Sequence, residues 1–216
     1  MKVVIFGSSG MVGQGVLREC LEDADVTEIV AVVRSASGSP GRAKLREIVH
    51  RDFEDFSGLD LGTEVDACFW CLGVTSAGMS EADYTRITHD YTMAAAKVLA
   101  KPTVVFVFVS GTGADGSSMW ARVKRKTEQD VATLPFKEVY VFRPGMIQPL
   151  HGIRSRTRIY NVLYPLIYPL MLLTKVIRPG FVTTTERVGR AMLHIAKKGY
   201  SKKLLENPDI NEAARG

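Results

Sequence analysis

The sequence has little cysteine, with Cys20, Cys68 and Cys71 its only three among 216 residues. A small, odd number of cysteines predicts no disulfide framework and, by default, a reducing cytoplasmic location. Cys68 and Cys71 form a C-x-x-C within the apolar stretch 65–72. Residues three apart on a strand lie on opposite faces, so we expect two buried small residues and no metal or redox pair.

The chain also lacks a strong charge imbalance. Its 28 basic residues exceed its 23 acidic residues by five, and the excess is spread along the chain. Nucleic-acid binding needs clustered basic residues and a recognition motif, so we expect no nucleic-acid partner. The hydrophobic share of 46% and the charged share of 24% are ordinary for a globular protein with a substantial core.

No stretch predicts a transmembrane segment. Residues 159–177 are the most hydrophobic part, but a lysine, an asparagine and two prolines interrupt them, whereas a spanning helix needs about 20 predominantly apolar residues. A buried helical pair, a lid over an apolar substrate, a homodimer contact and a peripheral contact with lipid all stay open. Met1 and Lys2 run directly into an apolar strand, so we expect no signal peptide.

What the chain does contain is a regular alternation of apolar, β-branched runs with helical patterns. Strands are predicted at 2–6, 28–33, 45–50, 65–72, 103–110 and 138–142, and helices at 11–22, 80–100, 118–133 and 183–199. Ser80 is the expected N-cap of the second helix, and Thr183 with Glu186 has capping-box spacing for the last. The pattern predicts an α/β fold with a doubly wound parallel sheet. We expect one domain over 1–216, with 150–182 as a substrate-side region.

A glycine-rich turn, "FGSSGMVG", joins the first strand to the first helix. A dinucleotide-binding fold needs glycines here for a tight turn, for close approach of the backbone to a pyrophosphate, and for packing of helix on strand. The spacing is G-x-x-G-x-x-G, and its place at the start of a βαβ chain indicates a dinucleotide-binding turn. It predicts a cofactor site that includes Gly7, Ser8, Ser9, Gly10, Met11, Val12 and Gly13.

The second strand leads directly into Arg34. NAD-binding folds carry an acidic residue near this position for the ribose hydroxyls, whereas a guanidinium pairs bidentately with phosphate. Arg34 therefore favours NADP(H) over NAD as the cofactor. A solvated loop arginine is the alternative that the sequence leaves open.

Further motifs are "RDF" at 51–53, "CLGVTSAG" at 71–78, "VSGTGAD" at 109–115, "VKRKTE" at 123–128 and "FRPGMIQP" at 142–149. With these motifs the chain resembles the short-chain dehydrogenase/reductase superfamily over residues 1–200. It is most similar to the atypical and extended, epimerase-like members, in the branch that includes the Tat-interacting oxidoreductase-like proteins.

The resemblance implies roles for the matching positions. Ser110 or Thr112 would hold a substrate oxygen, and Lys124 would bind the nicotinamide ribose and lower the pKa of a catalytic tyrosine. The remaining cofactor contacts would border the adenine, the ribose and the nicotinamide, and come from Asp52, Phe53, Cys71, Leu72, Gly73, Thr75, Pro144, Gly145 and Met146.

The sequence departs from this family at the catalytic acid. The family has a tyrosine four residues before the lysine, where this chain has Trp120. An indole N–H can donate a hydrogen bond but does not titrate usefully, so it cannot act as a general acid. His151, in the loop after the sixth strand, is an alternative donor. Two functions stay open: an NADPH-dependent oxidoreductase or epimerase acting on a small carbonyl or hydroxyl substrate, and a non-catalytic NADP(H)-binding regulatory or redox-sensing protein.

Overall fold

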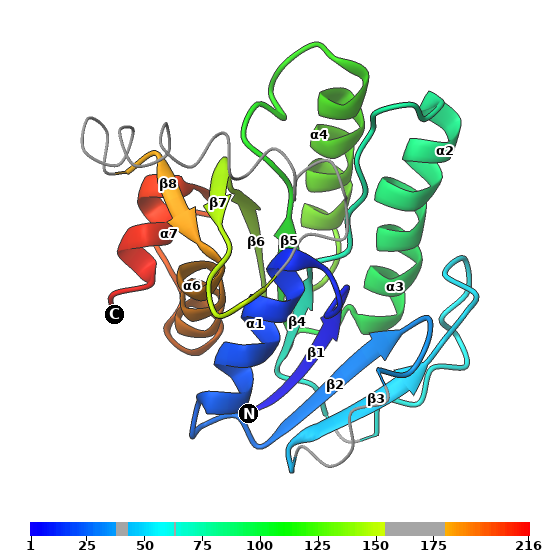
Figure 1. The fold of residues 1–216 in the computed structure, drawn as a ribbon. Coiled ribbons are helices and arrows are strands. Elements are labelled where there is room, and N and C mark those ends of the chain that lie inside the picture. Colours follow the sequence, from blue (N-terminus) through cyan, green and yellow to red (C-terminus); the bar gives the residue numbers. More distant parts are fainter. Residues whose placement is uncertain (38–42, 63, 154–179) are drawn as a thin grey trace.

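The computed structural model describes residues 1–37, 43–62, 64–153 and 180–216. A seven-stranded parallel sheet forms the centre, helices cover both of its faces, and a two-stranded sheet lies beside it (Figure 1). The apolar stretch 159–177, for which the sequence leaves four roles open, lies outside the described residues. Most of the substrate-side region predicted at 150–182 lies outside them as well.

The large sheet has the strand order β3-β2-β1-β4-β5-β6-β9. Its strands are β1 (Lys2–Phe6), β2 (Glu28–Val33), β3 (Leu45–Val49), β4 (Ala67–Trp70), β5 (Val105–Val109), β6 (Glu138–Arg143) and β9 (Leu204–Glu206). The order reverses between β1 and β4, and open α/β sheets bind ligands beyond the carboxyl ends of their strands at such a point. The six strands predicted from the sequence are confirmed, as is the doubly wound parallel fold.

Two helical layers sandwich this sheet (Figure 1). One layer consists of α1 (Met11–Glu22), α6 (Thr185–Lys198) and α7 (Asn207–Ala213), and the other contains α3 (Tyr91–Leu99) and α4 (Met119–Ala132). Alternate residues of β1 pack against the two layers: Val3 and Ile5 belong to one core cluster, and Val4 and Phe6 belong to the other. The central strands β4 and β5 are apolar throughout because both of their faces are buried, whereas the edge strand β3 contains charged residues that are not buried.

The helix predicted at 80–100 is interrupted. It consists of α2 (Glu81–Thr85), a π-helical turn η1 (Arg86–Asp90) and α3. Ser80 caps α2 as predicted, with its hydroxyl accepting a hydrogen bond from the Asp83 amide at 3.1 Å. The π turn packs against α4, where His89 Nε2 lies 2.7 Å from the Asp130 carboxylate. The predicted long helix is therefore present over residues 81–99, with one π-helical turn within it.

The cap predicted for the last helix lies one residue too early. Thr184 is the N-cap of α6, and its hydroxyl accepts a hydrogen bond from the Arg187 amide at 3.1 Å. Thr183 belongs instead to β8 (Val182–Thr184), which pairs in parallel with β7 (Met146–Gln148).

Candidate functional site

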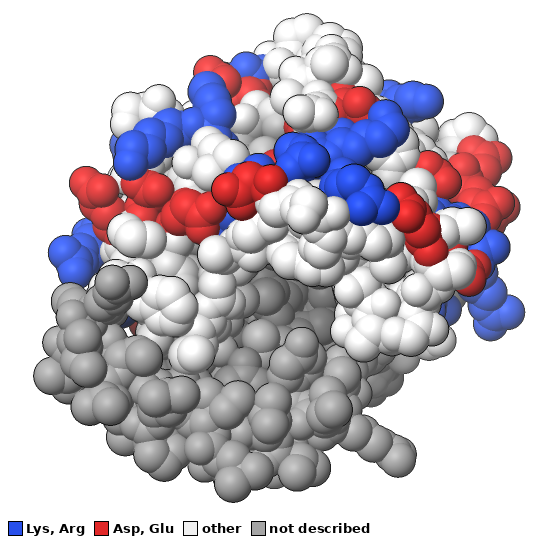
Figure 2. All heavy atoms as spheres, turned by 90° about the horizontal axis from the view of Figure 1, so that it is seen from above, with Lys and Arg blue, Asp and Glu red and all other residues white. Residues whose placement is uncertain are grey.

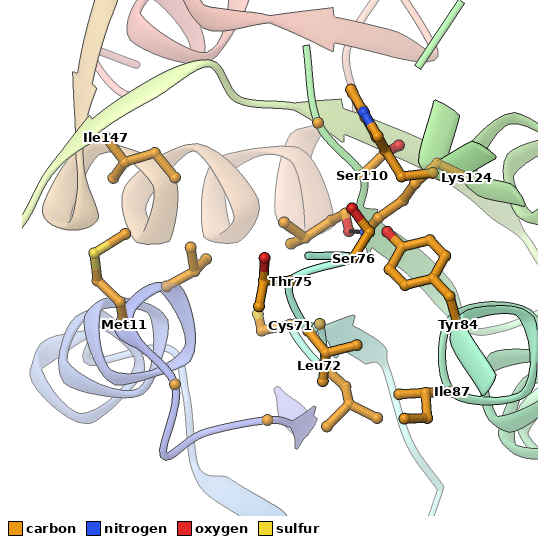
Figure 3. Close-up of a pocket in the computed structure, with 18 of the residues that line it drawn as sticks. Met11, Cys71, Leu72, Thr75, Ser76, Tyr84, Ile87, Ser110, Lys124 and Ile147 are labelled. Atoms are coloured by element: carbon orange, nitrogen blue, oxygen red, sulfur yellow. Dashed lines mark hydrogen bonds between the residues drawn. The ribbon is translucent and has the colours of Figure 1, made fainter. Parts of the chain in front are cut away.

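A cavity of about 1040 Å³ lies at the carboxyl ends of β1, β4 and β5 (Figure 3). Its volume is at the upper end of the range for small-molecule sites, about 300–1,000 Å³. Seen from above, basic and acidic side chains are interspersed over the described surface, and uncharged atoms border a hollow (Figure 2). The position is the one expected for the ligand site of a doubly wound sheet.

The glycine turn forms one wall of this cavity, and its backbone conformation requires glycine. Gly7 has φ +74°, and a Cβ on it would lie 2.7 Å from the carbonyl carbon of Cys71. A Cβ on Gly13 would lie only 2.1 Å from the Gly7 carbonyl oxygen. Gly10 is the N-cap of α1, contributes no side-chain bond, and is followed by no acidic residue in the first turn. The positive end of α1 therefore faces the cavity without a competing anion, which suits a pyrophosphate.

Two arginines line the cavity where β2 and β3 end. Arg34 was predicted to lie here, whereas Arg51 was not singled out by the sequence analysis. Both are exposed, and neither forms an ion pair with another described residue. Phe53 and Tyr91 provide an aromatic wall nearby, with ring centroids 5.9 Å apart. This end of the cavity offers two free guanidinium groups beside aromatic rings.

Lys124 reaches the cavity at its other end from α4. Its Nζ donates a hydrogen bond to the Val109 carbonyl oxygen at 3.0 Å and lies 5.2 Å from the centre of the Phe108 ring. Burial lowers the pKa of Lys124 to about 8, although the neighbouring Glu128 partly opposes this effect. A buried lysine that is held by one carbonyl keeps its other N–H groups for hydrogen bonds to a ligand.

A buried ion pair lies beneath this end of the cavity. The Glu128 carboxylate accepts hydrogen bonds from Arg143 Nε at 3.0 Å and Arg143 Nη2 at 2.5 Å, and it also accepts one from the Ser110 hydroxyl. The bond with Glu128 holds the pKa of Arg143 above its ordinary value. Because an ionised carboxylate has no proton to give, Ser110 is the donor in its bond to Glu128. Ser110 therefore presents an accepting oxygen to the cavity.

Trp120 also lines the cavity, one helical turn before Lys124. Its ring packs on the glycine loop after β5, since a Cβ on Gly113 would lie 3.5 Å from it. Thr112 is turned elsewhere: its hydroxyl lies 2.8 Å from both the Arg143 carbonyl oxygen and the Glu206 carboxylate. Of the two hydroxyls considered for the substrate oxygen, only Ser110 faces the cavity.

The structure brings most of the predicted site residues together around this cavity. Those that line it are Gly7, Ser9, Gly10, Met11, Val12, Arg34, Phe53, Cys71, Leu72, Gly73, Thr75, Ser110, Trp120, Lys124, Gly145 and Met146. Predicted residues outside the lining are Ser8, Gly13, Asp52, Thr112 and Pro144. Asp52, for example, accepts a hydrogen bond from the Glu54 amide at 3.0 Å.

Several lining residues were missed by the sequence analysis. Tyr84, Ile87 and Tyr91 are spaced at i, i+3 and i+7, so they occupy one face of the α2–α3 segment. That spacing was the available signal, but a helix face that borders a cavity has the same pattern as one that borders a core. Glu128 was quoted only as part of a motif, although its place four residues after Lys124 puts both on one face of α4.

The sequence analysis also considered His151 as a proton donor, and Cys68 with Cys71 as a pair. His151 has φ +56°, its Nε2 forms a hydrogen bond with the Glu186 carboxylate at 2.9 Å, and it does not line the cavity. Cys68 and Cys71 belong to opposite core clusters, as predicted for positions three apart on a strand. Burial raises the pKa of Cys71 to about 12, so its thiol stays protonated. Within the described residues there is no group of three or more side chains that could hold a metal ion.

Comparisons of sequence place the chain among fungal and animal proteins. It is 30% identical to the mitochondrial protein FMP52 of Saccharomyces cerevisiae, over 73% of this chain and 69% of the relative. It is 34% identical to the mitochondrial protein fmp52 of Emericella nidulans, over 72% and 70% respectively. Protein HTATIP2 of Rattus norvegicus is 30% identical over 67% of this chain and 62% of its own length. No protein-family model matches the chain.

The fungal names contradict the predicted cytoplasmic location, because both relatives are named as mitochondrial proteins. The prediction was based on scarce cysteine, and scarcity of disulfides does not distinguish one reducing compartment from another. In the described parts of the chain, no helix combines the length and the apolar character needed to span a bilayer.

Solved structures share the fold at low sequence identity. A UDP-glucuronic acid 4-epimerase from Bacillus cereus in complex with NAD has a TM-score of 0.69 at 12% identity, covering 95% of this chain and 76% of that chain. A short-chain dehydrogenase/reductase family oxidoreductase from Burkholderia thailandensis has a TM-score of 0.69 at 15% identity, covering 100% and 93%. These likenesses show a shared fold.

Proposed function

We propose that this chain, which belongs to the family of the FMP52 proteins and shares the fold of a short-chain dehydrogenase/reductase family oxidoreductase, binds NADP(H) in this cavity. We further propose that it acts as an oxidoreductase on a small carbonyl or hydroxyl substrate. The observation that carries the proposal is the pairing of two arginines, Arg34 and Arg51, at one end of a cavity whose other end holds Lys124 and Ser110.

The glycine turn supports the placement of the cofactor. A pyrophosphate needs backbone N–H donors at close range and no negative charge beside it, and the start of α1 at Gly10 meets both needs. Phe53 and Tyr91 would border the adenine, and Arg34 and Arg51 would hold the 2′-phosphate that distinguishes NADP from NAD. Gly145 and Met146 would flank the nicotinamide.

The reaction end supports binding of a small polar substrate. A bound nicotinamide supplies or takes up a hydride. The remaining N–H groups of Lys124 would donate to the ribose hydroxyls, and its buried charge would favour ionisation of a hydroxyl nearby. The Ser110 oxygen would accept a hydrogen bond from a substrate hydroxyl, because its own proton is directed to Glu128.

Trp120 favours the second candidate function, an NADP(H)-binding protein without catalysis. Its indole stands in the cavity where the superfamily has a titrating phenol. Both candidate functions require the same cofactor site. They differ only in whether another group of this chain supplies the proton.

Calorimetric titration of arginine variants tests the cofactor assignment. Arg34→Ala and Arg51→Ala should each weaken NADP(H) binding by about 1.5–3 kcal/mol, the scale of a hydrogen bond to a charged group, and leave NAD(H) binding unchanged. Arg46→Ala is the matched control, since Arg46 lies at the amino end of β3, outside the cavity lining. An equal loss for both cofactors, or no loss in either cavity variant, contradicts the assignment.

A further inference from the structure

A second tyrosine enters the cavity from a different helix. Tyr84 of α2 is only 2% exposed and yet lines the cavity, so the small accessible part of its side chain faces the ligand space. Figure 3 shows it extending from its helix toward Ser76, with Ser110 and Lys124 in the same part of the cavity. The phenol therefore lies at the end where the proposed reaction takes place.

The position of Tyr84 is fixed relative to the lysine helix. Arg122, in the first turn of α4, donates to both carboxylate oxygens of Glu81, at 2.9 Å and 3.1 Å. Glu81 begins α2, whose N-terminus Ser80 caps. Tyr84 and Lys124 are thus carried by two helices that are joined at their starts and in contact. This arrangement holds a phenol and a buried ammonium on one side of the ligand space.

The other tyrosine of the cavity lining has a different neighbourhood. Tyr91 is the first residue of α3, and its ring centroid lies 5.9 Å from that of Phe53 at the arginine end. It is therefore distant from the reaction end in the layout proposed above and offers a matched control. Among the described lining residues, Tyr84 is the phenol that shares an end with Lys124 and Ser110.

Two of the other groups at this end are poor proton donors. Trp120 does not titrate, and the proton of Ser110 is directed to Glu128. Burial raises the pKa of Tyr84, with the Thr88 hydroxyl partly offsetting this effect, so the phenol is protonated at neutral pH. A protonated phenol in the cavity can donate to a substrate oxygen.

We propose that Tyr84 is the catalytic acid that replaces the superfamily tyrosine, and that the substrate it serves is an aldehyde or ketone; this rests on the proposed NADP(H) function. The carbonyl carbon takes up a hydride from the reduced nicotinamide, and the carbonyl oxygen takes the phenol proton. The products are an alcohol, the oxidised cofactor and a tyrosinate. The tyrosinate regains its proton from water.

The kinetic test compares a variant of Tyr84 with a variant of Tyr200, which lies outside the cavity lining. NADPH oxidation is followed with a panel of aliphatic and aromatic aldehydes and ketones, and NADPH affinity is measured separately by calorimetry. Tyr84→Phe should lower the turnover rate about 10²–10⁴-fold, the contribution of general acid catalysis, while NADPH affinity stays at the wild-type value. Tyr200→Phe, which removes a phenol that lies outside the cavity lining and donates to Glu212, should keep the wild-type turnover rate.

A second readout does not depend on turnover. Protein labelled with ¹³C at the tyrosine Cζ is saturated with NADP⁺, which cannot reduce a ketone, and cyclohexanone is then added. The resonance that disappears in Tyr84→Phe should shift on this addition, and the resonance that disappears in Tyr91→Phe should not.

The outcomes separate the two proposals. Failure of the wild type to bind NADPH contradicts the proposed function itself. NADPH binding without reduction of any carbonyl overturns both the proposed reduction of a carbonyl and the assignment of Tyr84, and leaves the cofactor site standing. Unchanged turnover in Tyr84→Phe, or a Tyr84 resonance that does not shift with cyclohexanone, overturns the assignment of Tyr84 alone.

Discussion

The two ends of the cavity are built in different ways. The phosphate end is made of backbone, and glycines at positions 7, 10 and 13 allow the chain to approach itself and a ligand closely. The reaction end is made of buried polar side chains, with Ser110, Glu128 and Arg143 held by one another and Lys124 held by the Val109 carbonyl oxygen. At the phosphate end, an added side-chain atom would clash with the backbone. At the reaction end, removal of one side chain would leave its buried partner without a hydrogen bond or counter-ion.

Removal of the buried negative charge should have the largest effect on stability. Glu128→Gln leaves Arg143 in the interior without its counter-ion, and breaking such a pair typically costs about 3–5 kcal/mol. Glu81→Gln, which breaks the exposed pair with Arg122, should cost under about 1 kcal/mol. Urea unfolding of both variants measures the difference, and similar losses would show that the cluster is not a buried unit.

An added methyl group should damage the phosphate end. Gly13→Ala would bring a Cβ within 2.1 Å of the Gly7 carbonyl oxygen, a backbone atom that cannot move aside. We expect a loss of about 3 kcal/mol in the free energy of unfolding, at the upper end of overpacking costs. Gly10→Ala meets the same oxygen at 3.3 Å and should cost much less. Thermal or urea unfolding decides, and equal costs would contradict the account of the turn.

Lys124 should make stability depend on pH in the alkaline range. Its pKa is about 8 in the folded protein and 10.5 ordinarily, so between these values the unfolded chain binds a proton that the folded chain has lost. The free energy of unfolding therefore rises with pH from about 8 to 10.5. Lys124→Met should remove this rise and stabilise the protein near neutral pH by on the order of 2 kcal/mol.

The same substitution should weaken NADP(H) binding, because it removes the donor proposed for the ribose. Unfolding curves across this pH range, combined with calorimetry, check both effects. A wild-type stability that is flat with pH would show that Lys124 is already neutral or well solvated, and retained NADP(H) affinity would remove it from the cofactor site.

The sequence predicted the sheet and the phosphate end because both depend on local patterns. Continuous apolar strands and glycine spacing follow from the chain itself, as in "TVVFVFVS" and "FGSSGMVG". The three-residue β9 was missed because it is too short for a periodic signal. Tyr84 and Arg51 were missed because their role depends on which helix face and which loop border the cavity, and that is decided by packing between distant segments.

Cofactor titration of the unmodified protein tests the central claim most directly. The account predicts that NADP(H) binds about 10-fold or more tightly than NAD(H), since the two arginines at the β2 and β3 ends would contact a phosphate that NAD(H) lacks. Equal affinity for both cofactors would contradict the assignment of Arg34 and Arg51. Binding of neither would contradict the proposal that this cavity is a dinucleotide site.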